Sequence, residues 1–304
     1  MGPYRETTRP TQRFRTTWTK WQRLHSAPVL VLRVRSIWHT RTMRTASDVI
    51  LRLTSDPARC GLVMDFDGVL APIVDDPSAS ALLPGAEDVL ATLAEHLGVV
   101  GLLSGRPVSF LRERLSLNSV VLMGSYGVET WTDDGIHVLP AVAAFSDAVA
   151  EAEAELRRLF DSPAVPGIHV ESKGLAVAVH WRRAADRAVA QRLVEAATTE
   201  IASLTGLRRE PGKLVEELRP PVEEDKGTGL LRAIAAAGVD VVAYAGDDRG
   251  DLPAFAAVLA SGGEALVVKG DDIAPEVAAV DGVQFDGPQA FLDWMKELAA
   301  QLER

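Results

Sequence analysis

From Arg59 onward, short and continuous apolar runs alternate with alanine-rich stretches of helical character. The runs with strand character are GLVM, VVGLL, VVLM, VVAYA and ALVV, and each is apolar at nearly every position. Strands that are buried on both faces have this composition, and they occur in parallel sheets with helices on each side. The pattern therefore predicts an α/β fold with a parallel-sheet core.

The segment from Pro140 to Pro220 breaks this alternation. It contains two helical stretches and the strand-like runs IHVESKG, LAVAVHWRR, LRREPG and KLVEELRP, with Gly174 and Gly212 placed for hairpin turns. Helices and paired strands in this order indicate a small α+β insertion with an antiparallel sheet. We therefore expect a cap domain at 140–220, inserted into a core domain formed by 46–139 and 221–304.

Residues 1–45 differ in composition from the remainder. They hold ten of the 32 lysines and arginines and one acid, Glu6, without helical or strand periodicity. We expect a poorly ordered extension, with Met43 as an alternative natural start. A targeting segment and a basic arm for nucleic acid or membrane surfaces are the other interpretations. The remainder carries 22 bases and 41 acids. We expect no nucleic-acid partner, because phosphate contacts need clustered lysine and arginine.

The cysteine content and the length of the apolar runs indicate the cellular compartment in which the protein is expected. The chain has one cysteine, Cys60, which cannot form an intramolecular disulfide. A membrane helix requires about 20 consecutive apolar residues, and the sequence contains no such run. We therefore expect a cytoplasmic protein with no membrane partner.

Two aspartates separated by one residue follow the first apolar run, in GLVMDFDGVLAPI. Alternate residues of an extended chain point to the same side, so Asp65 and Asp67 would converge on one ion or substrate. Gly68 would let the chain turn away. The carboxyl end of a parallel strand is also where open α/β sheets bind ligands. Taken alone, the pattern fits a solvated acidic loop as well.

Three further strand or helix ends carry groups suited to a phosphate and a cation. LLSGRP places Ser104 and Gly105 after the second run, VVAYAGDDRGDLPAF places Asp247, Asp248 and Asp251 after another, and EEDKGTGLL places Lys226 at a helix start. Carboxylates this close repel one another unless a cation compensates them, and Mg²⁺ suits a site completed by phosphate and water. Each motif alone also fits a turn, a helix cap or a surface lysine.

In this order, the four motifs resemble those of the haloacid dehalogenase-like phosphatases. The resemblance implies a Rossmann-like core in which Asp65 is the nucleophile and Asp67 the general acid and base. It implies the phosphate ligands Ser104, Gly105, Arg106 and Lys226, and the metal ligands Asp65, Asp67, Asp247 and Asp248. The chemistry agrees, because a phosphate dianion repels an attacking carboxylate and needs the positive charge that Mg²⁺ and Lys226 supply.

Charged residues alternate along the strand-like runs of the cap. Glu171 and Lys173 share one side of an extended chain, as do Lys213 and Glu217, and such a face suits sugar hydroxyls. Cross-strand salt bridges on a solvated sheet are the alternative. The motifs DFDGVLAPI, SGR, GSYGVE, ESKG, HWR, GKLVEELRP, DKG and GDDRGD resemble those of the trehalose-6-phosphate phosphatases. The resemblance implies that the sugar contacts are Glu171, Lys173, Arg182, Lys213 and Glu217.

This resemblance implies hydrolysis of trehalose 6-phosphate to trehalose and phosphate, with trehalose-phosphate synthase as a partner. The chain departs from the family pattern at Tyr126, where His or Asn is usual, at Val69, where Thr is usual, and at Leu252 and Pro253, where acids are common. Sucrose, mannosylglycerate and glucosylglycerate phosphates are alternative substrates. A catalytically silent regulatory domain is the alternative of another class, and the intact acids and lysine of the motifs speak against it.

Overall fold

The structure, a computed structural model, describes residues 44–304 with the exception of 75, 133, 162–165, 213 and 271. Residues 1–43, which make up most of the extension expected at 1–45, therefore lie outside the described residues. The chain divides into two compact units. We call Val138–Glu223 the cap unit, and the chain before and after it the core unit.

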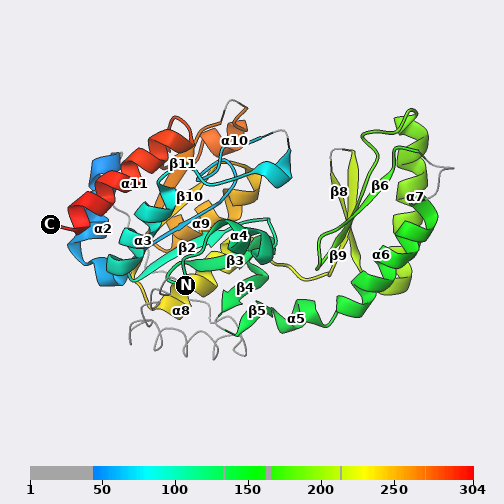
Figure 1. Cartoon of the computed structure of the whole chain (residues 1–304), viewed down its shortest axis with the longest axis horizontal. Helices are drawn as coiled ribbons and strands as arrows, with labels where there is room; N and C mark the ends of the chain where they lie inside the picture. Colours follow the sequence, from blue (N-terminus) through cyan, green and yellow to red (C-terminus); the bar gives the residue numbers. More distant parts are fainter. Residues whose placement is uncertain (1–43, 75, 133, 162–165, 213, 271) are drawn as a thin grey trace, which may run out of the picture. The chain divides into compact units, whose positions relative to one another are not determined.

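The core unit is built on an eight-stranded sheet in the order β12-β11-β10-β1-β2-β3-β4-β5 (Figure 1). Its strands are β1 (Cys60–Met64), β2 (Val99–Leu103), β3 (Val121–Gly124), β4 (Glu129–Thr132), β5 (Gly135–Val138), β10 (Val241–Gly246), β11 (Glu264–Val268) and β12 (Val283–Phe285). Pairing is parallel from β12 to β3, and β4 joins β3 in antiparallel orientation. The five apolar runs are β1, β2, β3, β10 and β11, so the predicted α/β core is confirmed.

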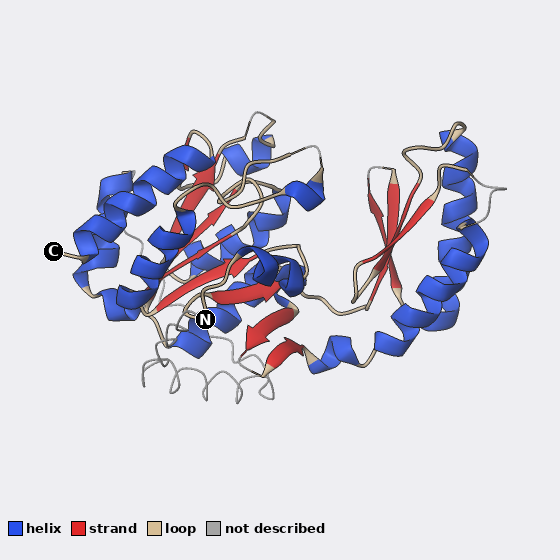
Figure 2. Cartoon of the chain, viewed as in Figure 1, coloured by secondary structure: helices blue, strands red, loops and turns tan. Residues whose placement is uncertain are grey.

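Helices cover both faces of this sheet, as Figure 2 shows. One side holds α2 (Ala46–Ser55), α3 (Ala86–His96), α4 (Val108–Arg114) and α11 (Pro288–Leu302), and the other holds α8 (Lys226–Ala237), α9 (Leu252–Ala260) and α10 (Pro275–Ala278). Side chains alternate along a strand, so Leu62 and Met64 join the first apolar cluster and Val63 joins the second. This two-sided burial explains why the runs are apolar throughout.

The cap unit holds a four-stranded antiparallel sheet in the order β6-β7-β9-β8. Its strands are β6 (His169–Ser172), β7 (Val177–His180), β8 (Arg208–Gly212) and β9 (Val215–Arg219), and its helices are α5 (Pro140–Ala143), α6 (Ser146–Phe160) and α7 (Arg187–Thr205). Side chains of α6 and α7 form one apolar cluster with Val170, Val177 and Leu218, so these two helices cover one face of the sheet.

The two hairpins of the cap unit turn in different ways. Gly174 has a φ of +74° between β6 and β7, as expected for a turn glycine. Gly212 instead pairs with Val215 inside the second hairpin, and the positive φ of +62° falls on Leu214. Gly212 therefore borders the second turn, because its pair with Val215 is the last of the ladder, but it does not supply the positive φ of that turn.

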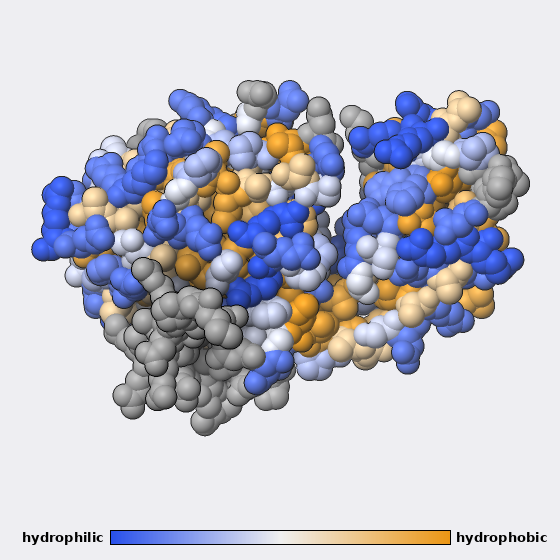
Figure 3. Space-filling model, in the orientation of Figure 1, coloured by the Kyte–Doolittle hydropathy of each residue, from blue (hydrophilic) through white to orange (hydrophobic). Residues whose placement is uncertain are grey.

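The surface is polar where Figure 3 shows it. Hydrophilic residues cover most of the visible face of each unit, and apolar residues form small patches between them. This is the usual surface of a protein whose apolar clusters are internal. Within the described ranges, no helix combines the length and the apolar character needed to cross a membrane.

Candidate active site

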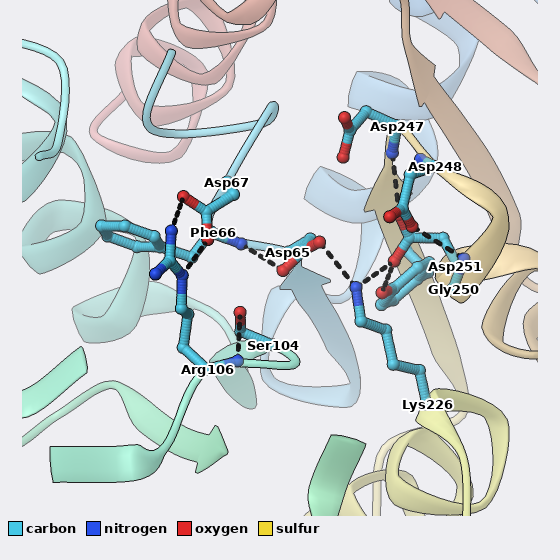
Figure 4. A network of polar contacts seen from close by, with 11 residues as sticks. Asp65, Phe66, Asp67, Ser104, Arg106, Lys226, Asp247, Asp248, Gly250 and Asp251 are labelled. Carbon is cyan, nitrogen blue, oxygen red and sulfur yellow. Dashed lines mark hydrogen bonds and ion pairs between the residues drawn. The ribbon is translucent and has the colours of Figure 1, made fainter. Parts of the chain in front are cut away.

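The predicted motifs meet at one edge of the core sheet (Figure 4). Asp65 directly follows β1, Ser104 follows β2, Asp247 follows β10, and Lys226 is the first residue of α8. Because β10, β1 and β2 are neighbours and parallel, their carboxyl ends lie side by side. The sheet topology thus brings together residues that are up to 182 positions apart in the sequence.

A buried lysine joins two buried carboxylates at this edge. Nζ of Lys226 lies 2.6 Å from Oδ2 of Asp65 and 2.7 Å from Oδ1 of Asp251. The three residues are 2%, 5% and 0% exposed. Burial by itself would lower the pKa of Lys226, but attraction to the two carboxylates and its hydrogen bonds to them raise that pKa above its usual value. The ammonium is therefore held in its charged form.

Asp251 organises the loop after β10. Besides Lys226, it accepts hydrogen bonds from the hydroxyl of Tyr244 at 2.6 Å and from the backbone amides of Asp247 and Asp248 at 2.9 and 3.1 Å. Burial would raise the pKa of Asp251, but the ion pair with Lys226 and these donors lower it. Asp251 belongs to the acidic motif but was not predicted as a site residue. The missed signal is a capping box in η4 (Arg249–Asp251), which pairs it with Asp248.

Four carboxylates form a compact acidic cluster, which consists of Asp65, Asp247, Asp248 and Asp251. One oxygen atom from each lies within 4.8 Å of those of the others. Burial, with repulsion from the neighbouring acids, raises the pKa of Asp247 to about 8. Burial is also the main cause that raises the pKa of Asp65 to about 7, against the attraction of Lys226. Such a set is compensated by a hard divalent cation with oxygen ligands.

The hydrogen bonds that each carboxylate already accepts indicate which of them can bind a cation. Each oxygen of Asp251 already accepts two hydrogen bonds, whereas each oxygen of Asp65 accepts one, so the carboxylates of Asp65, Asp247 and Asp248 are the ones that fit best. Gly68 allows the close approach of Asp247, because a Cβ at this glycine would lie 2.0 Å from the Asp247 carboxylate. Gly68 also has a φ of +74°, in the left-handed region that residues other than glycine rarely adopt.

The carboxylate of Asp67, which was expected among the metal ligands, lies outside the acidic cluster. It accepts hydrogen bonds from Nε of Arg106 at 2.6 Å, from Nη2 of Arg106 at 3.1 Å and from Oγ of Ser80 at 2.7 Å. Figure 4 shows Asp67 turned toward Arg106, while Asp65 faces Lys226. The physical reason is that a guanidinium binds a carboxylate through two parallel hydrogen bonds, which fixes its direction.

Ser80 and Arg114 support Asp67 from outside the predicted motifs. Ser80 is 2% exposed, and its carbonyl oxygen accepts a hydrogen bond of 2.7 Å from Nε of Arg114. The guanidinium groups of Arg106 and Arg114 both lie over the ring of Phe110, at 4.5 and 3.4 Å from its centroid. The sequence contains no motif that would signal Ser80, because only the fold brings this loop residue to Asp67.

The SGR loop follows β2 and is fixed by its own backbone. Ser104 is 2% exposed, its amide donates to the carbonyl of Met123 at 3.0 Å, and its Oγ accepts from the amide of Arg106 at 3.2 Å. Gly105 is exposed beside it. Of the predicted phosphate ligands, Ser104 and Lys226 therefore border Asp65, while Arg106 is occupied by Asp67 (Figure 4).

The residues predicted to contact the sugar all belong to the cap unit. Lys173 pairs with Glu217 at 2.6 Å, and a ring nitrogen of His180 lies 2.7 Å from Glu171. The hydrogen bond from His180 is the main cause that lowers the pKa of Glu171. Through Ala178, the strand register aligns Glu171 with Glu217. Arg182 is exposed after β7, and Lys213 lies outside the described residues.

Comparison with known proteins shows which family this chain resembles. A family model described as trehalose-phosphatase matches residues 63–285. Trehalose-phosphate phosphatases from Mycobacterium tuberculosis and Mycobacterium marinum are 36% and 35% identical over 244 and 250 residues, which cover 78% and 80% of this chain. The same segments cover 61% and 62% of those proteins, so the chain spans about three fifths of their length.

Solved structures extend the comparison to the fold. A trehalose-6-phosphate phosphatase related protein has a TM-score of 0.62 at 21% identity, over 79% of this chain and 97% of its own. The C-terminal domain of the Candida albicans trehalose-6-phosphate phosphatase has a TM-score of 0.61 at 20% identity, over 83% and 96%. At these identities the likeness concerns the fold. The family match and the relatives above 30% identity carry the further conclusion: the chain belongs to the trehalose-phosphatase family.

Proposed function

We propose that this protein hydrolyses trehalose 6-phosphate to trehalose and phosphate, with Asp65 as the nucleophile. The observation that carries the proposal is the buried contact of Asp65 with Lys226 beside Asp247 and Asp248, at strand ends that lie within the family match. A cytoplasmic location and trehalose-phosphate synthase, the kind of enzyme that would supply this substrate, belong to the same proposal.

In the first half-reaction, an oxygen of Asp65 bonds to phosphorus as the bond from phosphorus to the sugar oxygen breaks. The departing sugar oxygen takes a proton from Asp67. In the second, water attacks the aspartyl-phosphate and gives its proton to Asp67, which releases phosphate and restores Asp65. Lys226 offsets the negative charge that the carboxylate and the phosphoryl group bring together. Ser104 and the backbone after it bind the phosphate oxygens.

A divalent cation, which we propose to be Mg²⁺, fits the carboxylates of Asp65, Asp247 and Asp248. These groups are crowded and buried, and the raised pKa values of Asp65 and Asp247 support the need for a compensating charge. When bound, the ion supplies positive charge that stabilises the phosphoryl group during transfer. The side chain of Asp67 remains available for proton transfer in this arrangement.

The cap unit supplies the sugar contacts in this proposal. Glu171, Lys173 and Glu217 present carboxylates and an ammonium on one sheet, and these groups accept from and donate to sugar hydroxyls. Arg182 and Lys213 are proposed as further contacts. Discrimination between sugar esters then depends on the cap, because the phosphoryl chemistry is the same for all of them.

Replacement of the nucleophile should abolish the reaction. Asp65→Asn keeps the shape of the side chain but is a poor nucleophile, so phosphate release from trehalose 6-phosphate should fall at least about 1,000-fold. The measurement is phosphate release in the presence of Mg²⁺, with circular dichroism to confirm folding. Asp240→Asn is the matched control, since Asp240 is exposed and pairs with Arg59. Activity near that of the wild type would exclude Asp65 as the nucleophile.

Removal of the buried ammonium should destabilise the fold. Lys226→Met leaves two buried carboxylates without their cation, so the free energy of unfolding should fall by about 3–5 kcal/mol. Urea denaturation measures this change. Lys296→Met is the control, because Lys296 is half exposed and its pair with Asp293 should contribute less than about 1 kcal/mol. Equal stability of the two variants would contradict the role given to Lys226.

Affinity for Mg²⁺ should rise with pH. The raised pKa values mean that Asp247 and Asp65 carry protons below about 8 and about 7, and cation binding must displace them. The association constant should therefore increase by up to about 100-fold per pH unit below about pH 7, where both groups carry protons, by up to about tenfold between about pH 7 and pH 8, and then level off. Calorimetric titration with MgCl₂ measures it. A constant that does not change over this range would contradict the assignment, and Asp247→Asn should flatten the dependence.

The cap should govern the choice of sugar ester. Glu217→Gln removes an acceptor charge, so kcat/KM for trehalose 6-phosphate should fall about tenfold relative to that for acetyl phosphate, which has no sugar. The same panel includes sucrose, mannosylglycerate and glucosylglycerate phosphates, and the wild type should prefer trehalose 6-phosphate. Glu151→Gln, on the exposed side of α6, is the control. An equal loss of kcat/KM for trehalose 6-phosphate and for acetyl phosphate would assign selectivity to another part of the chain.

A further inference from the structure

Tyr126 occupies a strained turn between β3 and β4. Ser125 and Tyr126 have φ values of +50° and +61°, in the left-handed region that residues other than glycine rarely adopt. The turn η3 (Ser125–Gly127) is held by its neighbours, because the amide of Ser125 donates to the carbonyl of Arg106 at 2.8 Å and the amide of Tyr126 to that of Ser104 at 2.9 Å. Strain that the surroundings maintain in this way is typical of functional positions.

A buried acid fixes the same turn to the start of α4. Glu129 is 7% exposed, and its carboxylate accepts a hydrogen bond of 2.6 Å from the amide of Val108. Burial raises the pKa of Glu129, while the hydrogen bonds from Val108 and from the side chain of Ser125 oppose that rise. Glu129 therefore ties the strained turn and the helix after the SGR loop into one rigid piece.

The strain places the Tyr126 ring beside the phosphate-binding segments. A Cβ at Gly105 would lie 3.0 Å from Cζ and 3.1 Å from the hydroxyl oxygen of Tyr126, so the ring lies directly beside this glycine. On its other side the turn touches the first turn of α8, since a Cβ at Gly127 would lie 2.8 Å from Cα of Gly229. The ring thus lies next to the loop that carries Ser104, and its turn abuts the helix that carries Lys226.

Tyr126 is also the only exposed phenylalanine, tyrosine or tryptophan among the described residues, with 38% of its surface accessible. In an in-line displacement by Asp65, the leaving group points away from this buried carboxylate and therefore toward the exposed groups at this edge. The phenol offers a flat apolar face for the carbon skeleton of a sugar and a hydroxyl for its oxygens. We propose that Tyr126 is a specificity-determining residue that packs against the sugar of the leaving group, an inference that rests on the proposed function.

The test compares phosphate substrates with and without a sugar. In Tyr126→Ala and Tyr126→Gly, the ratio of kcat/KM for trehalose 6-phosphate to that for acetyl phosphate should fall about 10-fold or more, mainly through KM. Glycine suits the positive φ, so agreement between the two variants separates loss of the ring from a change in the turn. Tyr126→Phe should retain the part of the ratio that the ring face provides. Ile136→Ala, an exposed apolar residue of β5, is the control and should leave the ratio unchanged.

Each other outcome has a defined meaning. A ratio within about twofold of the wild type in both ring-deleted variants would overturn the proposal. An equal loss of kcat/KM for trehalose 6-phosphate and for acetyl phosphate would also overturn it, because the ring would then support only the loop. If the wild type prefers another sugar phosphate, the proposed substrate fails and that ester replaces trehalose 6-phosphate in the same ratio. A wild type that shows no preference for any sugar ester would overturn the role of Tyr126 as well.

Discussion

The ion pairs of Lys226 with Asp65 and Asp251 are the interaction on which the site depends. An unpaired charge at this depth would be strongly unfavourable, so the lysine and the two carboxylates require one another. Asp251 also receives the amides of Asp247 and Asp248, and the same carboxylate therefore sets the course of the loop after β10. One buried charge network thus positions Asp65, which is the proposed nucleophile, together with the ammonium of Lys226 and the remaining acids.

Sheet topology turns this network into a reactive site. Parallel pairing of β10, β1 and β2 ends three strands at the same edge, where side chains from distant parts of the sequence can meet. The remaining acids, Asp247 and Asp248, then lie close to Asp65, and fewer positive charges and hydrogen-bond donors offset their charge than is the case for Asp251. An excess of buried negative charge at one point is neutralised either by protons or by a cation, and a bound cation gives the environment in which a carboxylate can approach a phosphate.

The sequence predicted most of the core because its signals are local. Continuous apolar runs marked five strands, and each acid or hydroxyl that follows a strand directly, such as Asp65 and Ser104, could be placed from that position. The contacts between loops could not be predicted in the same way. Ser80 reaches Asp67 from 13 residues away, and Tyr126 meets Gly105 through a turn whose strain no pattern reveals. Nor does the sequence show that Arg106 binds the carboxylate of Asp67, which the resemblance placed among the metal ligands.

Arg106 contacts Asp67, the proposed general acid and base, and is also expected to bind phosphate. Its Nε and Nη2 bind Asp67, while Nη1 takes no part in that contact. A guanidinium has five donors in one plane, so the edge that Asp67 leaves unused can serve an anion without releasing the carboxylate. Stacking on Phe110 fixes the plane itself. The observed contact of Arg106 with Asp67 and its expected contact with phosphate are therefore compatible. Together they would hold Asp67, the proposed general acid and base, at a constant distance from the leaving oxygen of the substrate.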